Sequence, residues 1–480
     1  MKESVALKRL TGIEAQIEKK MDEWSVPGAA VAVIHKEEVL YCSGFGYRDV
    51  HKQLPVDSET LFGIGSSTKP FTTMILAMLV QEGKIQWDTP IKEYLPNFRM
   101  YDAAATEMLT FRDIACHRSG MPDHNFMCHK PMLSAQQWVD ALPYLEPNLS
   151  FRHAFQYSSL MYAEAGYLIE CLTGIAYEEW VRERIFTPLN MRNSNFSIEQ
   201  TTAGSNFSKP YVMTENGIVE LPFTADQPGA AGAINSSVDQ LAAWVSFQLN
   251  RGVVKGQRHI DEDVMQELYI PQVIVKQGGA LPEFPEMPHT AYGLGWFIDC
   301  YRGHNLVHHS GRIDGFTAHV SFMPAEDVGI VVLANQNMSF LPDSLAYTLY
   351  DQLLAMEAVD WTSKFQQHEK KIYEMIAAMN PAADRVDVPN AQKDLLPFDS
   401  YTGLYNHPAY GDITIKQLDG KLVFDFRTLI SDLTGLNSLQ FLAEEVGLPF
   451  TFTVDEQGKI VGVQLPLEPS VQPIVFSKQL

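Results

Sequence analysis

The stretch Phe62-Gly-Ile-Gly-Ser-Ser-Thr-Lys-Pro-Phe-Thr-Thr-Met-Ile-Leu-Ala-Met-Leu-Val80 changes from a glycine-containing turn into an apolar run. From Phe71 onward the run is apolar nearly all round, which predicts a buried helix. Pro70 has no amide hydrogen and is best tolerated in the first turn of a helix. We therefore expect this buried helix to begin near Ser66 or Ser67.

Ser66 and Lys69 would then lie on one face of the helix, because residues three apart are neighbours on a helical surface. A serine beside an amine, at the positive end of a buried helix, has the features of an activated nucleophile. Backbone N–H groups at such a helix start also favour an oxyanion. Ser66-Ser-Thr-Lys69 is the only Ser-x-x-Lys in the chain. The alternative interpretation is a buried lysine satisfied by neighbouring carbonyl groups.

Length, charge and cysteine usage limit the class of protein. A chain of 480 residues with 46% hydrophobic content predicts two or three domains with a sizeable core. A formal charge of -22 disfavours nucleic acid and anionic membranes as partners. The five cysteines are scattered and odd in number, which favours a reducing compartment. Neither an apolar leader nor a spanning run is visible, so we expect a cytoplasmic protein, or a periplasmic or secreted one if a leader has been removed.

The hydrophobic pattern predicts a mixed α/β (α+β) fold. Thr11–Trp24 is typical of an amphipathic helix, and an all-helical region follows between about Leu109 and Met191. We expect one antiparallel sheet of about five strands flanked by helices. The expected strands are Ala29–His35, Val39–Phe45, Tyr292–Ile298, Ala318–Met323 and Gly329–Asn335.

The chain changes character near Trp361. Lys364–Met379 is charged and helical, and the polar stretch after it contains two prolines, which is typical of a connector. Asp412–Phe426 and Phe450–Leu465 each split around a glycine-containing turn and predict two hairpins. We therefore predict a main domain at residues 1–360, a helical and polar linker at 361–397, and a small antiparallel β-barrel-like domain at 398–480.

Further phrases along the chain carry a family resemblance. Together with Ser66-x-x-Lys69 they are similar to the serine β-lactamase and penicillin-binding-protein superfamily, in particular the branch of class C β-lactamases, D-aminopeptidases and related esterases. The resemblance covers roughly residues 10–355 and implies a β-lactamase/transpeptidase-like fold. The phrases are Asp88-Thr-Pro-Ile-Lys-Glu-Tyr-Leu-Pro96, Phe111-Arg-Asp-Ile-Ala-Cys-His-Arg-Ser-Gly-Met-Pro122, Tyr157-Ser-Ser-Leu-Met-Tyr162, Pro188-Leu-Asn-Met191 and His308-His-Ser-Gly-Arg-Ile-Asp-Gly-Phe316.

The C-terminal segment resembles the lipocalin-like domain appended to some members of this superfamily. The resemblance is carried by Tyr401-Thr-Gly-Leu-Tyr405, by His407-Pro-Ala-Tyr-Gly411 and by a hairpin turn at Asp419-Gly420. In relatives this domain walls the active site or builds oligomers. Both roles, including self-association of this chain, remain open at this point.

The family's second motif, Tyr-x-Asn, reads Tyr157-Ser-Ser159 here. The resemblance implies that the phenol of Tyr157 takes and returns a proton beside the serine and lysine. Tyr41-Cys-Ser43 also fits the spacing, but Tyr41 lies in the middle of an expected strand. Ser159 is expected at the substrate, with less reach toward a substrate amide than the asparagine of the family.

The third motif, Lys-Thr-Gly or His-x-Gly, reads His309-Ser310-Gly311, and Lys276-Gln-Gly278 is a less suitable rival. Gly311 would let the substrate backbone lie close to a strand, with Ser310 and Arg312 beside it as substrate-binding residues. The resemblance implies a second oxyanion N–H from Arg312, next to that of Ser66. The Arg312 guanidinium binds a substrate carboxylate, or else it points to solvent or pairs with Asp314.

No cofactor and no metal site is expected. Cys116-His117, His124 and Cys128-His129 lack the spacing of a zinc site. The group His304, His308 and His309 is open to the same objection.

These features predict a serine hydrolase that forms an acyl-enzyme with a small-molecule or peptide substrate. Ser66 attacks a carbonyl, Lys69 acts as base with Tyr157, and Tyr157 with His309 nearby returns a proton to the leaving group. The favoured substrates are D-amino-acid-containing peptides or small amides and esters. The rival enzyme is a β-lactamase or DD-carboxypeptidase, and the rival of another class is a non-catalytic peptide-binding protein.

Overall fold

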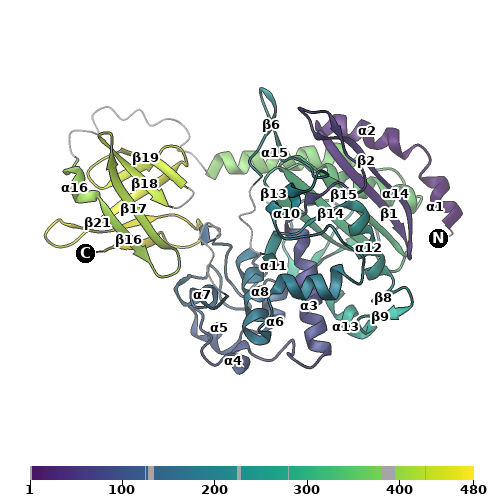
Figure 1. The fold of residues 1–480 in the computed structure, drawn as a ribbon, viewed down its shortest axis with the longest axis horizontal. Coiled ribbons are helices and arrows are strands. Elements are labelled where there is room, and N and C mark those ends of the chain that lie inside the picture. Colours follow the sequence, from purple (N-terminus) through teal and green to yellow (C-terminus); the bar gives the residue numbers. More distant parts are fainter. Residues whose placement is uncertain are drawn as a thin grey trace. The chain divides into compact units, whose positions relative to one another are not determined.

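The computed structural model divides the chain into two compact units, each assembled from several segments (Figure 1). The first unit comprises Met1–Pro90, Thr110–Arg118 and Tyr162–Met375, and the second comprises Ile91–Leu109, Ser119–Met161 and Ile376–Leu480. The structure describes residues 3–124, 126–127, 135–223, 229–278, 281–379, 395–426 and 429–479.

The first unit is built on an antiparallel sheet of nine described strands, in the order β10-β11-β12-β13-β14-β15-β1-β2-β3 (Figure 1). The central strands β1, β14 and β15 are buried along their whole length, as expected for strands covered on both faces. The strands are β1 Gly28–His35, β2 Glu38–Asp49, β3 Leu54–Pro55, β10 Val273–Val275, β11 Thr290–Tyr292, β12 Phe297–Tyr301, β13 His304–Ile313, β14 Phe316–Met323 and β15 Val328–Ala334.

Helices cover both faces of this sheet. A side chain at Gly329 of β15 would touch Val245 of α12 (Val238–Leu249). The next residue, Ile330, instead belongs to the apolar core that contains α14 (Leu341–Leu353). Because successive strand residues point to opposite faces, α12 and α14 lie on opposite sides of the sheet.

Several predicted helices of the first unit are confirmed. The expected helix at Thr11–Trp24 is α2, and its buried residues Ile13, Ile17, Met21 and Trp24 form the expected apolar face. The other helices of this unit are α1 Glu3–Arg9, α2 Ile13–Trp24, η1 Gly65–Thr68, α3 Lys69–Gln81, α6 Phe111–Ala115, α8 Ser159–Thr173 (its first residues belong to the second unit), α9 Tyr177–Val181, η4 Arg182–Phe186, α10 Ile198–Ala203, α11 Gly229–Gly232, α13 Glu262–Gln266, η5 Glu267–Tyr269 and α15 Trp361–Met379.

Three two-stranded ladders complete the first unit. The pairing of β4 with β7 lies next to the Ser66 segment, since Gly63 pairs with Asn235. The strands are β4 Phe62–Gly63 with β7 Asn235–Ser236, β5 Tyr211–Thr214 with β6 Gly217–Glu220, and β8 Val253–Val254 with β9 Gln257–Arg258.

Two of the strand predictions need correction. The stretch Tyr292–Ile298 is not one strand, because it contains the turn between β11 and β12. Gly295 in that turn has φ +85°, and a Cβ there would lie 2.3 Å from the Thr73 hydroxyl. Strand β13 was missed because its sequence is rich in histidine and polar residues, so it lacks the apolar alternation by which strands are recognised.

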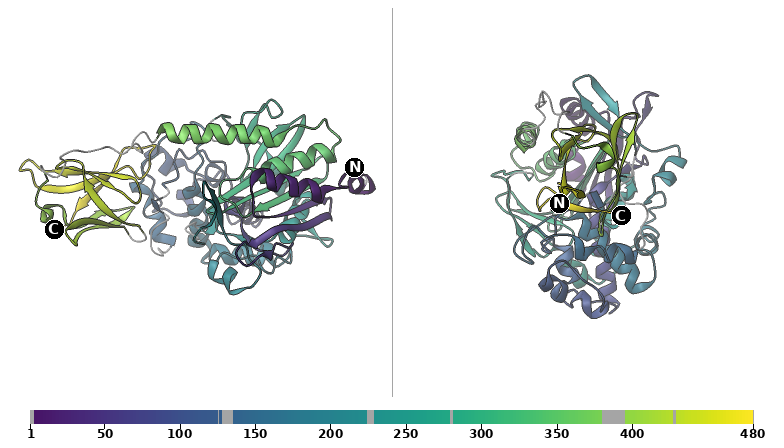
Figure 2. Two further views of the ribbon diagram at one scale, coloured as in Figure 1. Left: turned by 90° about the horizontal axis from the view of Figure 1, so that it is seen from above. Right: turned by 90° about the vertical axis from the view of Figure 1, so that its left-hand side faces the viewer.

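The second unit contains a closed antiparallel barrel of eight strands, which confirms the small β-barrel predicted from the hairpins. Figure 2 shows its yellow-green strands curving round on one another. Tyr401, Tyr405, Phe424, Phe441 and Phe452 are buried in it. The strands are β16 Gly403–His407, β17 Gly411–Leu418, β18 Lys421–Phe426, β19 Leu429–Gly435, β20 Gln440–Ala443, β21 Leu448–Val454, β22 Ile460–Leu465 and β23 Ile474–Lys478.

The helices of the second unit are short. They are α4 Ile91–Tyr94, α5 Ala103–Met108, α7 Ala135–Val139, η3 Leu142–Tyr144 and α16 Phe398–Tyr401. Within the predicted linker 361–397, Trp361 and Phe365 of α15 are buried in the core of the first unit, whereas residues 380–394 lie outside the described residues. None of the helices that the structure describes is both long enough and apolar enough to cross a bilayer.

Candidate active site

Ser66 lies in the short turn η1, directly ahead of α3, which begins at Lys69. The predicted helix start near Ser66 is therefore a tighter 3-10 turn that leads into the α-helix. Residues three apart eclipse one another in a 3-10 turn, which stacks the two side chains. The Nζ atom of Lys69 donates to the Ser66 hydroxyl at 3.1 Å.

Lys69 is fully buried and is held from several directions. Its Nζ also donates to the carbonyl of Ala231 in α11 at 3.0 Å. The ring of Tyr162 lies 5.4 Å from the same nitrogen. A carbonyl partner was the alternative interpretation of this lysine, and the structure shows the carbonyl contact and the Ser66 contact together.

Two glycines let the turn that carries Ser66 (η1, Gly65–Thr68), here called the serine turn, pack against strand β13. Gly65 has φ +51°, and a Cβ there would lie 2.9 Å from the Arg312 backbone nitrogen. A Cβ on Gly311 would lie 1.8 Å from the Ile64 carbonyl oxygen and 3.0 Å from the Ser67 nitrogen. Only glycine permits so close an approach of two backbones.

A side-chain contact fastens the same junction. The hydroxyl of Ser67 donates to the His309 carbonyl of β13 at 2.9 Å. The structure thus brings Ser66, Lys69, Gly311 and the backbone of Arg312 into one place. This is the juxtaposition that the predicted pair of oxyanion donors requires.

His309 is buried, and both of its ring nitrogens have partners. Nδ1 lies 2.8 Å from the Ser310 carbonyl, which can only accept, so Nδ1 carries the proton. Nε2 then accepts from the hydroxyl of Tyr292 at 3.0 Å. Burial, together with the charge of Lys69, holds the pKa of His309 well below its usual value, so the ring is neutral.

Three aromatic side chains that sequence reasoning did not assign lie beside Lys69 and His309. The ring of His117 lies 4.9 Å from the rings of both Tyr162 and Tyr292. Burial, with a smaller effect of Lys69, also keeps the pKa of His117 well below its usual value. Tyr162 donates to the Ala115 carbonyl at 2.6 Å. His117 and Tyr162 lie in the family-like phrases, which was the one signal that could have found them.

The opposite face of β13 carries a second polar cluster. The carboxylate of Asp343, in the first turn of α14, accepts from the Ser310 hydroxyl at 2.6 Å and lies 3.0 Å from His319 Nδ1. The Arg312 guanidinium donates to it at 3.4 Å. Burial alone would raise the pKa of Asp343, but the hydrogen bond from His319 and the charge of Arg312 outweigh burial and hold it well below its usual range.

This cluster changes two expectations for β13. The Arg312 guanidinium pairs with Asp343, and neither points freely to solvent nor pairs with Asp314. The Ser310 hydroxyl, expected at the substrate, is bound on the face opposite to Gly311. The backbone of Arg312 adjoins the serine turn.

Tyr157 and Ser159 lie in the second unit, on the segment Ser119–Met161. Tyr157 is half-buried, and Ser159 begins α8. The Ser159 N–H donates to the Asp123 carboxylate, and the Ser158 hydroxyl donates to the Pro122 carbonyl at 3.0 Å. Their approach to Ser66 stays a prediction.

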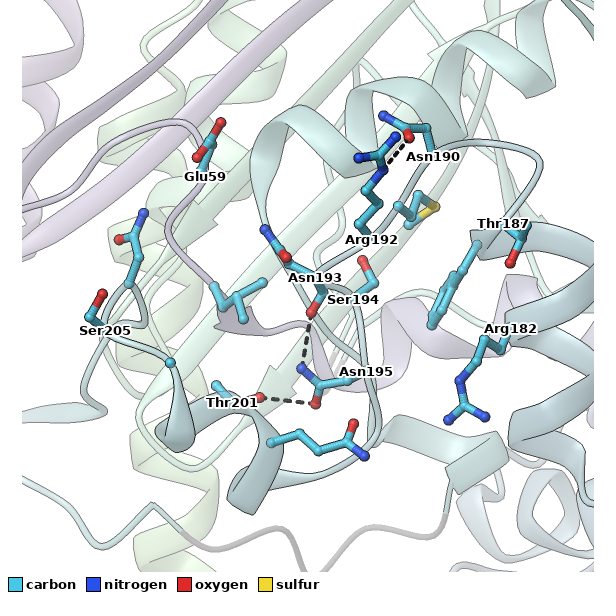
Figure 3. A pocket seen from close by; sticks show the side chains of 16 residues that line it. Glu59, Arg182, Thr187, Asn190, Arg192, Asn193, Ser194, Asn195, Thr201 and Ser205 are labelled. Atoms are coloured by element: carbon cyan, nitrogen blue, oxygen red, sulfur yellow. Dashed lines mark hydrogen bonds between the residues drawn. The ribbon is translucent and has the colours of Figure 1, made fainter.

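The first unit also has a polar hollow of about 770 Å³ (Figure 3). The lining residues include none of the predicted catalytic side chains, and some of their polar groups are bonded to one another. Asn195 accepts from Thr201 at 3.0 Å and donates to the Asn193 carbonyl at 3.0 Å, and Arg192 donates to Asn190 at 2.7 Å. The hollow is therefore separate from the predicted site.

Among the described residues, no group of three or more His, Cys, Asp and Glu side chains is placed to hold a metal ion. Cys128 and His129 lie outside the described part of the chain.

Residues 13–354 match a family model described as Beta-lactamase, and residues 388–478 match one described as a domain of unknown function, DUF3471. The unguisins hydrolase of Aspergillus campestris is 30% identical over 420 residues, covering 83% of this chain and 76% of that protein. The unguisins hydrolase of Aspergillus violaceofuscus is 30% identical over 439 residues, covering 85% and 77%. Protein flp of Staphylococcus aureus is 25% identical over 336 residues, covering 69% and 64%.

Solved structures share the fold. An octameric penicillin-binding protein homologue from Pyrococcus abyssi superposes with a TM-score of 0.61 at 22% identity, covering 98% of this chain and all of that chain (100%). A class C beta lactamase from Rhodobacter sphaeroides gives 0.57 at 19% identity, covering 71% and 98%. A D-stereospecific amidohydrolase from Streptomyces gives 0.54 at 20% identity, covering 74% and 100%.

Proposed function

This chain belongs to the beta-lactamase family and is a serine hydrolase, and we propose that it cleaves amide or ester bonds through an acyl-enzyme on Ser66. The proposed substrates are D-amino-acid-containing peptides or small amides and esters. One observation carries the proposal, namely the buried Lys69 Nζ held 3.1 Å from the Ser66 hydroxyl by the Ala231 carbonyl.

In the proposed acylation step, Lys69 in its neutral amine form accepts the hydroxyl proton while Ser66 Oγ bonds to the substrate carbonyl carbon. The carbonyl oxygen becomes an oxyanion between the N–H groups of Ser66 and Arg312. The tight packing of Gly65 on the Arg312 backbone supports this pairing of donors.

The tetrahedral intermediate then collapses, and the bond to the leaving group breaks as that group takes a proton from the Lys69–Tyr157 pair. Water attacks the resulting ester by the reverse route and frees Ser66. The place of Tyr157 in this step is proposed from the resemblance of Tyr157-Ser-Ser159 to the second motif of the family. Contacts at both ring nitrogens of His309 favour a role in holding the site wall over one in proton return.

Two observations favour amides and esters over the substrates of the rival enzyme. The curated relatives at 30% identity are named unguisins hydrolases. The neutral His309 also stands where the family motif can have a lysine, so that position offers no fixed positive charge to a substrate carboxylate. Such a charge would suit β-lactams and the C-terminal carboxylate of DD-carboxypeptidase substrates.

Intact-mass spectrometry after incubation with amides, esters and β-lactams tests this proposal. We expect D-amino acid amides or p-nitrophenyl esters to leave an acyl mass on the protein. Ser66→Ala should carry no acyl mass and should lose turnover by about 10⁴-fold or more. Ser205→Ala, on an exposed serine of the same unit, is the matched control.

Two other outcomes would favour the rivals. Rapid nitrocefin hydrolysis with slow ester and amide turnover would indicate a β-lactamase. Lack of Ser66 labelling by both a fluorophosphonate and a penicillin probe would indicate a binding protein. Self-association is a separate question, measured by light scattering, and the solved homologue from Pyrococcus abyssi is an octamer.

A further inference from the structure

Three consecutive residues of the second unit, Pro122, Asp123 and His124, connect the barrel with the Tyr157 motif. The barrel contacts His124, and the motif contacts Pro122 and Asp123. The barrel matches a domain of unknown function, and these contacts show which residues of the same unit it adjoins.

Two side chains of the barrel, those of Glu468 and Tyr410, form hydrogen bonds with His124. The Glu468 carboxylate accepts from the His124 backbone N–H at 3.0 Å, and its other oxygen accepts from the Ser470 N–H at 3.1 Å. The imidazole Nε2 lies 3.0 Å from the Glu146 carbonyl and must donate to it, which leaves Nδ1 as an acceptor. The Tyr410 hydroxyl donates to this Nδ1 at 2.8 Å.

The turn that presents Tyr410 is itself fixed. The His407 Nδ1 accepts from the N–H groups of Ala409 and Tyr410, each at 3.1 Å. Tyr410 is fully buried, and its ring meets the His124 ring edge-on at 6.1 Å. The segment His407-Pro-Ala-Tyr-Gly411 therefore does more than connect two strands, because it holds Tyr410 in contact with His124.

The backbone of His124 needs such support. Its φ is +44°, a left-handed conformation that costs a non-glycine residue about 1 to 2 kcal/mol. Residues held this way persist only where the surrounding contacts determine them strongly. His124 is fully buried, and two of its three hydrogen bonds named above come from the barrel.

On the other side, the same short segment holds the start of α8. The Pro122 carbonyl accepts from the Ser158 hydroxyl at 3.0 Å, and the Asp123 carboxylate accepts from the Ser159 N–H. A change in the backbone at His124 would move both acceptors, because they belong to the two residues before it. Ser158 and Ser159 follow directly on Tyr157.

We propose that the C-terminal barrel positions the Tyr157 motif, with Tyr410 and Glu468 as positioning residues that act through His124. The proposal rests on the proposed function in one respect, that Tyr157 takes part in proton transfer. It predicts that the barrel contributes to turnover without touching substrate.

The test compares barrel variants of the full chain by hydrogen exchange and by steady-state kinetics on a p-nitrophenyl ester. Tyr410→Phe and Glu468→Ala should each speed amide exchange in residues 119–124 and 157–161. Each should lower kcat by about fivefold to tenfold, the value of roughly one lost hydrogen bond, with KM nearly unchanged. Glu468→Gln keeps an acceptor oxygen and should recover most of the loss.

Tyr405→Phe is the matched control, because Tyr405 is an equally buried barrel tyrosine whose hydroxyl donates at 2.6 Å to the Tyr401 carbonyl inside the barrel. It should leave both exchange and kcat unchanged. The inference is overturned if Tyr410→Phe and Glu468→Ala match this control in both measurements. The two variants remove different bonds to His124, so either one that folds decides the matter.

A separate variant distinguishes the two proposals. If Tyr157→Phe keeps full turnover, the proposed role of Tyr157 fails, while faster exchange at 157–161 in Tyr410→Phe would still support the positioning. If Tyr157→Phe loses turnover but the barrel variants change neither exchange nor kcat, the positioning fails and the proposed function stands.

Discussion

The two faces of strand β13 use polar groups in opposite ways. On the face toward the serine turn, Gly311 presents bare backbone and His309 is neutral, with Lys69 as the strongest charge that acts on it. On the face toward α14, the Asp343 carboxylate is kept ionised by His319 and the Arg312 guanidinium. One strand therefore separates a close, uncharged backbone contact from a partly buried ion pair.

The difference arises because successive side chains of a strand point to opposite faces, so each face can serve a different purpose. Residues with small or neutral side chains let two backbones meet, and the residues between them carry the groups that hold the strand in place. Changes on the Gly311 face should therefore affect turnover first, and changes on the Asp343 face should affect stability first.

Gly311→Ala should have the largest effect. Its Cβ would lie 1.8 Å from the Ile64 carbonyl oxygen, so the serine turn must shift. A displacement near 1 Å at a reacting group can cost about 100-fold, which we expect in kcat/KM for an ester substrate. Gly204→Ala is the control, because the nearest atom there is at 3.4 Å. Unchanged kcat/KM in Gly311→Ala would contradict the described contact.

Asp343→Ala should come next and should act mainly on stability. It leaves the Ser310 hydroxyl and the Arg312 guanidinium without their shared acceptor. Loss of a buried charged acceptor should lower the free energy of unfolding in urea by about 2 kcal/mol. Asp343→Asn keeps an acceptor and should lose less. A fall in kcat/KM comparable with that of Gly311→Ala, at unchanged stability, would show that the two faces are not separate.

Acid should weaken the Asp343 face specifically. The pKa of Asp343 is lower in the folded protein than in the unfolded chain, so its contribution to stability is present above the unfolded value and is lost as the pH falls toward the folded one. The unfolded value is about 3.9, so the loss begins below about pH 4. We expect unfolding curves of the wild type and Asp343→Asn to converge below that pH. Parallel curves would assign the acid sensitivity to other groups.

Tyr292→Phe should have the smallest effect of the four. It removes the donor to His309 Nε2 but keeps the ring that packs against His117. Loss of one neutral hydrogen bond is worth about 1 kcal/mol, or roughly fivefold in kcat/KM. The pH profile between about 6 and 9 should keep its shape. A loss beyond 100-fold would mean that Tyr292 itself moves a proton.

Local patterns were enough to predict much of the fold and the contact between Lys69 and Ser66, whose role as nucleophile stays a prediction. The amphipathic helix expected at Thr11–Trp24 was found close to its observed bounds, Ile13–Trp24. Ser66 and Lys69 were found because their contact spans only three residues. The small β-barrel was visible in its glycine turns and alternating strands.

The rest of the site depends on contacts between residues far apart in the sequence. Tyr292 meets His309 across 17 residues, and Ser310 meets Asp343 across 33. Neither pair leaves a periodic signal, and the histidines of β13 hid the strand itself. Tyr157 was assigned by resemblance, and its place beside Ser66 stays a prediction.

The contact between the serine turn and β13 also determines how much of the chain must be synthesised before the site can form. Ser67 and His309 are 242 residues apart in the sequence, and their contact closes the junction. A chain still being synthesised has no partner for its serine turn until β13 has left the ribosome. Such distant pairings are formed late and slowly, because a long loop must close before any contact stabilises it. We therefore expect unfinished copies of this hydrolase that end before His309 to be inactive, because the proposed site can form only when most of the chain has been made.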